Sequence, residues 1–254
     1  MNTLEQLVSA EIFAPFLVFM RVGSAFVLLP GFGEAYVAMR YRLLLAAAIS
    51  FAIAPVVEGG LPSLPPTPAE LTMLLLTEIG IGLFLGMSAR LVLAALQVAG
   101  SIIAMQVGLS SVLVFDPSSQ QQGAITAAWL SGVAMTLMFV TDSHPLMLRA
   151  LADSYGVFHA GDIPPVGDFS DAAARLVADC FTLGVKLSAP FLVFGLVFFL
   201  ALGLIQRLMP QVQVFFVTQP LQIMSGFIIL AVTLSVGMGV FLDNFEVALG
   251  RFIG

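Results

Sequence analysis

The chain has 254 residues, of which 59% are hydrophobic and only 9% are charged, and its mean hydropathy is +1.06. These values lie far outside the range of soluble proteins and indicate an integral membrane protein. The net charge of −6 comes from acidic residues spread over the connecting segments, so nucleic acid is excluded as an expected partner.

The N-terminal part predicts two helices joined by a basic link. Residues 12–30 form the first apolar segment, which closes with Leu29-Pro30-Gly31. The second segment, residues 43–57, has about 15 residues, fewer than the about 20 that a spanning helix needs. No basic residue precedes the first segment, which argues against a cleaved signal peptide. Because Arg40 and Arg42 follow that segment, the positive-inside rule places the N-terminus outside.

The middle of the chain contains an apolar run that is too long for one membrane crossing. After a proline-rich link, residues 58–70, the run from Leu71 to Val107 would measure roughly 55 Å as one helix, against a hydrocarbon core of about 30 Å. This run must therefore bend, split or leave the lipid. Residues 124–140 predict the next apolar helix, residues 144–155 a short amphipathic helix, and residues 156–168 a loop.

The C-terminal part predicts two more long helices. Residues 169–209 form a second over-long run that stops at Pro210. The last apolar helix covers residues 221–240, and a short amphipathic tail follows it. The expected fold is an all-α integral membrane protein with about six principal hydrophobic helices.

The segment from Gln106 to Gly123 interrupts the hydropathy pattern in an unusual way. Its apolar centre, Val112 to Phe115, lies between paired serines and an Asp-Pro turn. Irregular backbone at membrane depth is stable only where protein or a water-filled cavity surrounds it. We therefore predict a loop that faces a pore or an assembly interface. The candidate gate residues are Gly108, Leu109, Ser110, Ser111, Val112, Leu113, Val114, Phe115, Asp116, Pro117 and Gln120.

Four charged residues lie within the apolar segments: Arg21, Glu78, Arg90 and Lys186. A charge at membrane depth costs about 2.5–3.5 kcal/mol on insertion scales. These side chains pair with one another, or extend their charged ends to the membrane surface, or line a polar conduit. Asp179 lies two turns before Lys186 and is a candidate partner for it only if a bend or a bridging group closes the gap.

Signals for enzymatic or metal chemistry are weak. Gly80-Ile81-Gly82 lacks the third glycine and the preceding strand of a dinucleotide site, whereas Gly82 and Gly86 form a pair that favours close helix packing. His144 and His159 lack companion ligands at metal-binding spacing. We predict no catalytic residue, no cofactor and no metal, and the single cysteine excludes an internal disulfide.

Three stretches in order resemble one family. They are Arg21 to Pro55, with a helix, a proline, a basic link and a closing Ala-Pro; Gly100 to Pro117, with a Gly-Leu-Ser step and Asp-Pro; and Leu202 to Leu221, with Met-Pro-Gln and Pro-Leu. Together they resemble the FliR family of flagellar type III export gate subunits, whose injectisome relatives are called SctT.

The resemblance implies a non-enzymatic subunit that assembles with FliP and FliQ, and with FlhB and FlhA, in the bacterial inner membrane at the flagellar basal body. It implies a FliP-like part over residues 1–168 and a FliQ-like helical hairpin over residues 169–254. The loop within residues 106–123 would be the plug of the export channel, with Gly108 and Gly123 as hinges. The hairpin turn, a predicted contact for FlhB, would contain Arg207, Pro210, Gln211 and Pro220. The alternatives are an injectisome export gate subunit, a stand-alone secondary transporter or channel, and a structural scaffold.

Overall fold

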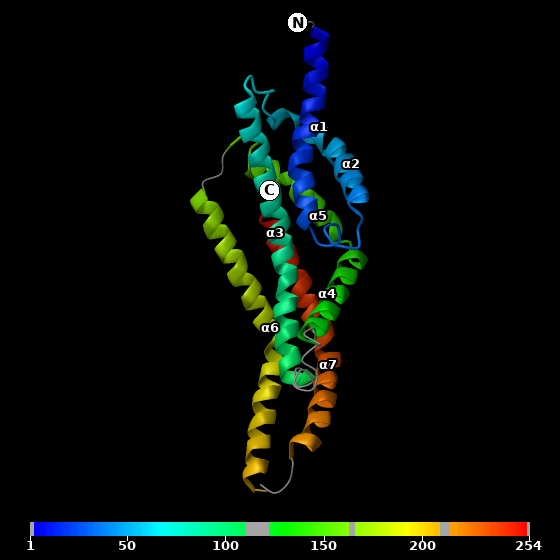
Figure 1. The fold of residues 1–254 in the computed structure, drawn as a ribbon, viewed down its shortest axis with the longest axis vertical. Helices are drawn as coiled ribbons and strands as arrows, with labels where there is room; N and C mark the ends of the chain where they lie inside the picture. The colour runs from blue at the N-terminus through cyan, green and yellow to red at the C-terminus, as the bar shows by residue number, and fades with distance from the viewer. Residues whose placement is uncertain (1–2, 110–121, 163–165, 209–213, 253–254) are drawn as a thin grey trace. The chain divides into compact units, whose positions relative to one another are not determined.

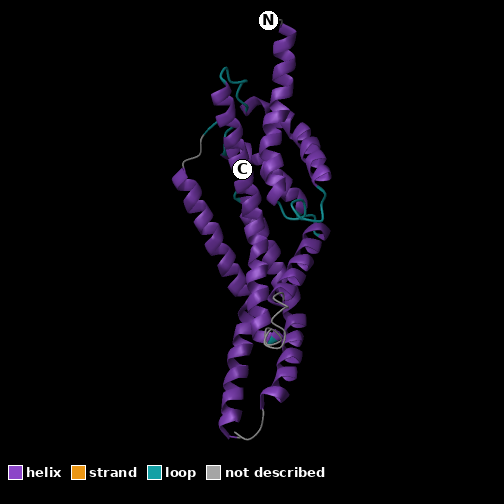
Figure 2. Cartoon of the chain, viewed as in Figure 1, coloured by secondary structure: helices purple, strands orange, loops and turns teal. Residues whose placement is uncertain are grey.

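The computed structural model describes residues 3–109, 122–162, 166–208 and 214–252, and within them the chain forms seven α-helices, one 3-10 turn and no strand (Figures 1 and 2). In chain order the elements are α1 (Thr3–Leu28), α2 (Met39–Val57), η1 (Glu58–Gly60), α3 (Pro68–Val107), α4 (Gln122–Val140), α5 (His144–Val157), α6 (Val166–Leu208) and α7 (Val214–Gly250). Four helices among these residues are long and apolar enough to cross a membrane, or five if the bent pair of α4 and α5 counts as one span. The prediction of an all-α membrane protein is confirmed.

Helix α2 begins earlier than predicted, because the basic link belongs to it. It starts at Met39 and has 19 residues rather than about 15. Its first turn is closed by a hydrogen bond from the Arg42 backbone N–H to the carbonyl of Ala38. The Arg42 side chain also donates to the carbonyls of Phe32 and Glu34, at 2.9 Å each. The link is therefore tied to the loop before it, and α2 has nearly the length that a crossing requires.

The over-long central run forms one helix of 40 residues, α3, which is about 60 Å long at 1.5 Å per residue. Thr67 caps its start, since its Oγ1 accepts a hydrogen bond of 3.3 Å from the Glu70 backbone N–H. Pro68 occupies the first turn, where its missing N–H costs nothing. The long apolar run therefore does not split into two helices.

Three predicted boundaries in the C-terminal part are wrong. Helix α6 begins at Val166, inside the segment predicted as a loop. Helix α7 begins at Val214, so that Pro220 lies inside a helix and does not mark the end of a turn. The predicted separate tail is also part of α7, because buried Phe241, Phe245 and Leu249 continue one helical face to its end. Proline costs an interior helix one hydrogen bond, and this loss is tolerated in membrane helices.

The contacts of the chain divide it into two compact units. Unit 1 contains Met1–Leu91, Met138–Leu176 and Phe245–Gly254, and unit 2 contains Val92–Leu137 and Val177–Asn244. The FliP-like and FliQ-like parts concern resemblance along the sequence rather than compactness, so that division stays a prediction.

In unit 1, α1 lies beside α2 and packs closely on α3 (Figure 1). A Cβ atom at Gly82 would overlap the carbonyl of Arg21 and the hydroxyl of Ser24. At Gly86 a Cβ atom would lie 2.6 Å from the carbonyl of Ala25. The predicted close packing through Gly82 and Gly86 is confirmed.

In unit 2, the C-terminal part of α3 is central, and glycines again allow the close approaches. A Cβ atom at Gly100 would lie 2.5 Å from Cα of Ala127 on α4. Where α6 and α7 approach α3, the glycine lies on the approaching helix. These glycines are Gly184 on α6 and Gly226 on α7. Three helices of unit 2 therefore pack directly on α3.

Candidate functional site

Only the beginning of the predicted gate loop lies in the described part of the chain. Gly108 and Leu109 follow directly on α3. The other predicted gate residues lie outside the described residues: Ser110, Ser111, Val112, Leu113, Val114, Phe115, Asp116, Pro117 and Gln120. The base of the loop in unit 2 is therefore what the structure describes of this site.

Gly108 ends α3 in a conformation that favours glycine. Its φ is +83°, in the left-handed region, and its N–H donates to the carbonyl of Met105 at 3.2 Å. A Cβ atom there would also lie 3.1 to 3.2 Å from the side-chain amide of Gln222. The backbone conformation therefore favours glycine at this position, and a larger residue would also push against the amide of Gln222.

Gln222 on α7 holds the end of α3. Its amide nitrogen Nε2 donates to the carbonyl of Gln106 at 2.8 Å, and the residue is 8% exposed. The last four carbonyls of a helix have no partner within the helix, and Gln106 supplies one of them. The buried amide of Gln222 therefore satisfies a partly buried acceptor at the point where the chain leaves α3.

One glycine on α7 and one on α6 let the backbones of these helices lie close to the C-terminal end of α3. A Cβ atom at Gly226 on α7 would lie 2.6 Å from methyl groups of Val107. At Gly195 on α6, a Cβ atom would overlap the side-chain oxygen of Gln106. A larger side chain at Gly226 would displace Val107 at the end of α3, whereas one at Gly195 would displace the side-chain amide of Gln106.

An apolar pocket of about 650 Å³ lies beside the base of the loop in unit 2. Its lining includes Val107 and Leu109 near the end of α3, Trp129 on α4, and Phe227 and Leu230 on α7. The described start of the loop thus lines this pocket together with other apolar side chains and lies next to a partly buried amide hydrogen bond.

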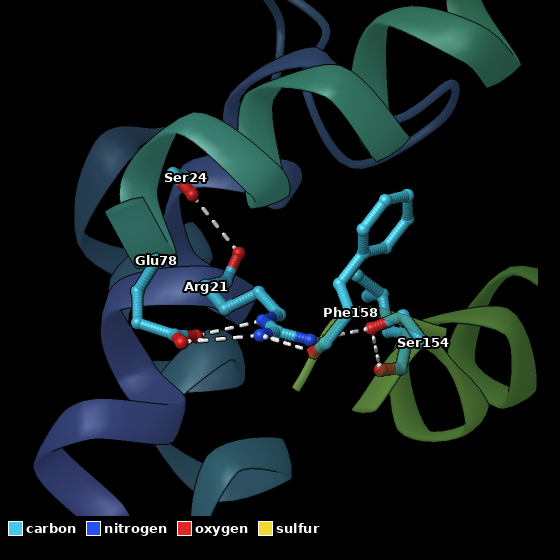
Figure 3. A network of polar contacts seen from close by, with 6 residues as sticks. Arg21, Ser24, Glu78, Ser154 and Phe158 are labelled. Carbon is cyan, nitrogen blue, oxygen red and sulfur yellow. Dashed lines mark hydrogen bonds and ion pairs between the residues drawn. The ribbon is translucent and has the colours of Figure 1, made fainter. Parts of the chain in front are cut away.

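A charged cluster lies in the core of unit 1 (Figure 3). The side chains of Arg21 and Glu78 are both 0% exposed. The guanidinium of Arg21 donates from Nε to Oε2 of Glu78 at 2.7 Å and from Nη2 to Oε1 at 3.1 Å. This bidentate geometry is the strongest arrangement of an arginine with a carboxylate.

The remaining contacts of Arg21 tie α1 to α5 and to the residue after it. Nη1 donates to Oγ of Ser154 at 3.1 Å, and Nη2 donates to the carbonyl of Phe158 at 3.0 Å. Cζ lies 3.7 Å from the centroid of the Tyr155 ring, within cation–π range. A guanidinium has five N–H donors, and the guanidinium of Arg21 donates four hydrogen bonds. The cluster therefore satisfies a charge that would otherwise be unstable in an apolar core.

The other two predicted intramembrane charges differ from this pair. Arg90 forms a partly exposed ion pair of 3.3 Å with Glu34, which lies in the loop between α1 and α2. Lys186 is exposed on α6, and among the described residues no ion pair or hydrogen bond reaches it, from Asp179 or from any other residue. The structure thus brings Arg21 and Glu78 together and leaves Lys186 apart.

The predicted hairpin residues are only partly described. Arg207 is exposed in the last turn of α6, and Pro220 is exposed within α7. Pro210 and Gln211 lie outside the described residues. Over the ranges that the structure covers, no group of three or more His, Cys, Asp or Glu side chains could hold a metal ion.

Comparison with known proteins identifies the family. Residues 12–248 match the family described as bacterial export proteins, family 1. The chain belongs to this family. Among the bacterial export proteins of family 1, the chain is similar to the flagellar biosynthetic protein FliR of Caulobacter vibrioides, with 37% identity over 95% of this chain and 96% of the relative. It is also similar to FliR of Bacillus subtilis, with 31% identity over 89% and 88%, and to FliR of Escherichia coli, with 30% identity over 80% and 77%.

These matches confirm the resemblance to the FliR family. The family match begins at residue 12 and ends at residue 248, so it includes both units. In this export protein, sequence reasoning missed Gln222 and the glycines Gly195 and Gly226. A signal was present, because Gln222 is a polar residue in an otherwise apolar helix, where a buried amide needs a partner.

Proposed function

We propose that the chain is a core subunit of the flagellar type III protein export gate, located in the bacterial inner membrane at the flagellar basal body. The observation that carries this proposal is the 37% identity over 95% of the chain to a protein named flagellar biosynthetic protein FliR. The named relatives are flagellar proteins, which favours a flagellar gate over an injectisome gate. A structural role without catalysis is part of this proposal.

We propose FliP, FliQ, FlhB and FlhA as the partners of this subunit. The support is the apolar surface that the chain leaves uncovered. Only 17% of the most apolar stretch of α6 and of α7 is buried within the chain, against 56% for α3. Exposed Val193, Leu196 and Leu200 on α6 and Val232 and Val236 on α7 belong to this surface. Lipid or other helices must cover it, and a gate subunit has both available.

We also propose that residues 106–123 include the plug of the channel. Support comes from the apolar residues between Ser111 and Asp116 and from the base described above. A plug must be dry when shut and displaceable by an unfolded chain. The four consecutive apolar residues of the sequence suit both requirements, since apolar constrictions exclude water without strong bonds.

Deletion of the gene in its own bacterium tests the proposed function. Flagellar hook and filament proteins should disappear from the culture medium, swimming should stop, and a plasmid copy of the gene should restore both. Other secretion systems in the same cells supply the control and should keep their export. Normal export of hook and filament proteins by the deletion strain would contradict the proposal.

A stand-alone transporter is the second candidate, and purification separates it from the gate subunit. Expressed alone, the chain should aggregate or be degraded, because its uncovered apolar surface lacks its partners. Co-expression with FliP and FliQ should give a stable complex. A folded, monodisperse monomer in detergent would favour the transporter.

A further inference from the structure

Helix α2, in unit 1, has the length of a single membrane crossing. Its 19 residues measure about 28 Å, against a hydrocarbon core of about 30 Å, whereas α3, α6 and α7 are far longer. No charged residue lies between Arg42 and Glu58. The one polar side chain in that stretch, Ser50, is buried and donates to the carbonyl of Ala46 at 2.6 Å. The outer surface of α2 between its charged ends is therefore apolar.

This apolar surface lies on one side of α2. Leu44, Phe51 and Val56 are each at least 67% exposed. The buried residues recur at steps of three and four residues along the opposite side, and they are Ala46, Ser50, Ile53 and Ala54. The helix thus has one face in the core of unit 1 and one face that the chain leaves uncovered.

Arg40 and Tyr41 continue the uncovered face into the first turn of α2. Arg40 precedes Leu44 by four residues and Phe51 by eleven, which is about one and three helical turns. Tyr41 precedes Leu44 by three residues and is exposed. Tyr36, in the loop before α2, is exposed as well. The apolar face therefore ends in an arginine and two tyrosines.

The cations at this end have no carboxylate bound to them. Over the residues that the structure describes, no ion pair or hydrogen bond reaches the side chain of Arg40. Arg42 donates to the backbone carbonyls of Phe32 and Glu34, which carry no net charge. The carboxylate of Glu34 pairs instead with Arg90. The start of α2 is therefore positively charged and complements an anion.

The order of these residues along α2 is typical of a membrane boundary. Tyrosine is enriched where lipid meets water, because its ring is apolar and its hydroxyl is polar. An arginine at that depth places its apolar stem along the lipid and its guanidinium among phosphate groups. Close packing of membrane helices uses small residues, as Gly82 and Gly86 show against α1. The most exposed side chains of α2 are large, which favours lipid over a second helix.

We propose that the start of α2 binds the headgroup of an anionic phospholipid, with Arg40 contacting the phosphate. Tyr36 and Tyr41 lie at the level of the headgroup, and an acyl chain lies along Leu44 and Phe51. The inference goes beyond the proposed function, because it requires only that the chain spans a membrane. Phosphatidylglycerol, which carries a net negative charge, should bind better than zwitterionic phosphatidylethanolamine.

Photo-crosslinking in living cells identifies what covers this face. The photoreactive amino acid p-benzoylphenylalanine replaces the residue at position 41 or 44. Its excited ketone takes a hydrogen atom from a nearby C–H bond, and the two radicals combine, so that the mass of the adduct is the sum of both partners. We expect peptides from both positions to carry the mass of a phospholipid. Adducts with another protein, or the absence of lipid adducts, would overturn the proposal.

Reconstitution measures the selectivity for the headgroup. The purified complex with the photoreactive residue at position 41 is placed in vesicles of phosphatidylglycerol and phosphatidylethanolamine in equal amounts. Phosphatidylglycerol adducts should exceed phosphatidylethanolamine adducts by about fivefold, the factor that one arginine at the membrane surface supplies. Equal amounts of the two adducts would overturn the proposal.

Variants assign this selectivity to Arg40. Arg40→Gln should bring the ratio of the two adducts to about one, and Arg40→Lys, which keeps the charge, should retain most of the preference. Arg149→Gln is the matched control, because Arg149 is exposed on α5 in the same unit. It should leave the ratio unchanged. A ratio that survives Arg40→Gln, or that falls equally in Arg149→Gln, would overturn the proposal. The proposed export function fails separately, through the deletion strain described above.

Discussion

Replacing Glu78 by alanine should destabilise unit 1 more than any other single change in its charged cluster. The substitution leaves the guanidinium of Arg21 at 0% exposure without its counter-charge. Ser154, the Phe158 carbonyl and the Tyr155 ring remain as partners, but none carries a negative charge. Removing one partner of a buried ion pair costs about 3–5 kcal/mol. At 1.4 kcal/mol per tenfold, the unfolding equilibrium constant should rise by roughly two to three and a half orders of magnitude.

Two further variants calibrate this value. Ser154→Ala removes one hydrogen bond to a charged group and should cost about 1.5–3 kcal/mol. The double variant Arg21→Met with Glu78→Leu removes both charges and fills the space with apolar atoms. It should recover most of the stability lost in Glu78→Ala, since replacing a buried ion pair by packed hydrophobic residues is often neutral.

The assay is thermal unfolding of the detergent-solubilised complex, followed as the loss of its monodisperse peak after heating. The predicted order of midpoints places wild type highest, the double variant and Ser154→Ala next, and Glu78→Ala lowest. A wild-type midpoint for Glu78→Ala would refute the reasoning. A double variant less stable than Glu78→Ala would refute it as well, because the lost counter-charge would then not be the cause.

Three other perturbations follow from the packing and the loop. Gly82→Leu should prevent close packing of α1 on α3 and abolish recovery of the complex on size exclusion, while Gly80→Leu, where a Cβ atom meets nothing within 4 Å, should be tolerated. Gln222→Leu leaves a partly buried carbonyl without its donor and should cost about 1 kcal/mol in thermal unfolding, and a midpoint equal to wild type would contradict the role of this amide. Deletion of residues 109–120 should leave the complex assembled but raise the ion conductance of the membrane, and an assembled, ion-tight variant would refute the plug.

The helices could be predicted from the sequence because long apolar runs with proline and glycine ends carry a strong local signal. The end of α3 before Gly108 is of this kind, whereas the helix begins at Pro68, three residues before the predicted Leu71. Pro220 misled the prediction for the same reason. A proline favours a helix end locally, but the apolar residues on both sides of Pro220 continue the helix.

The contacts of the site were harder to predict, because they join residues far apart in the sequence. Glu78 had both Arg21 and Arg90 as possible partners, and the choice depends on how α1 packs on α3. The glycine pair predicts that these helices approach closely, but it does not fix which side chains meet. Gln222 and Gln106 are 116 residues apart, so no local pattern connects them.

The most direct test of the central claim is to purify the tagged chain from inner membranes of its own bacterium and to identify the proteins that remain bound. The account predicts a stable complex that contains FliP and FliQ, recovered from cells that build flagella. A chain that is recovered alone, folded and monodisperse, while flagellar export continues in cells that lack its gene, would contradict the account.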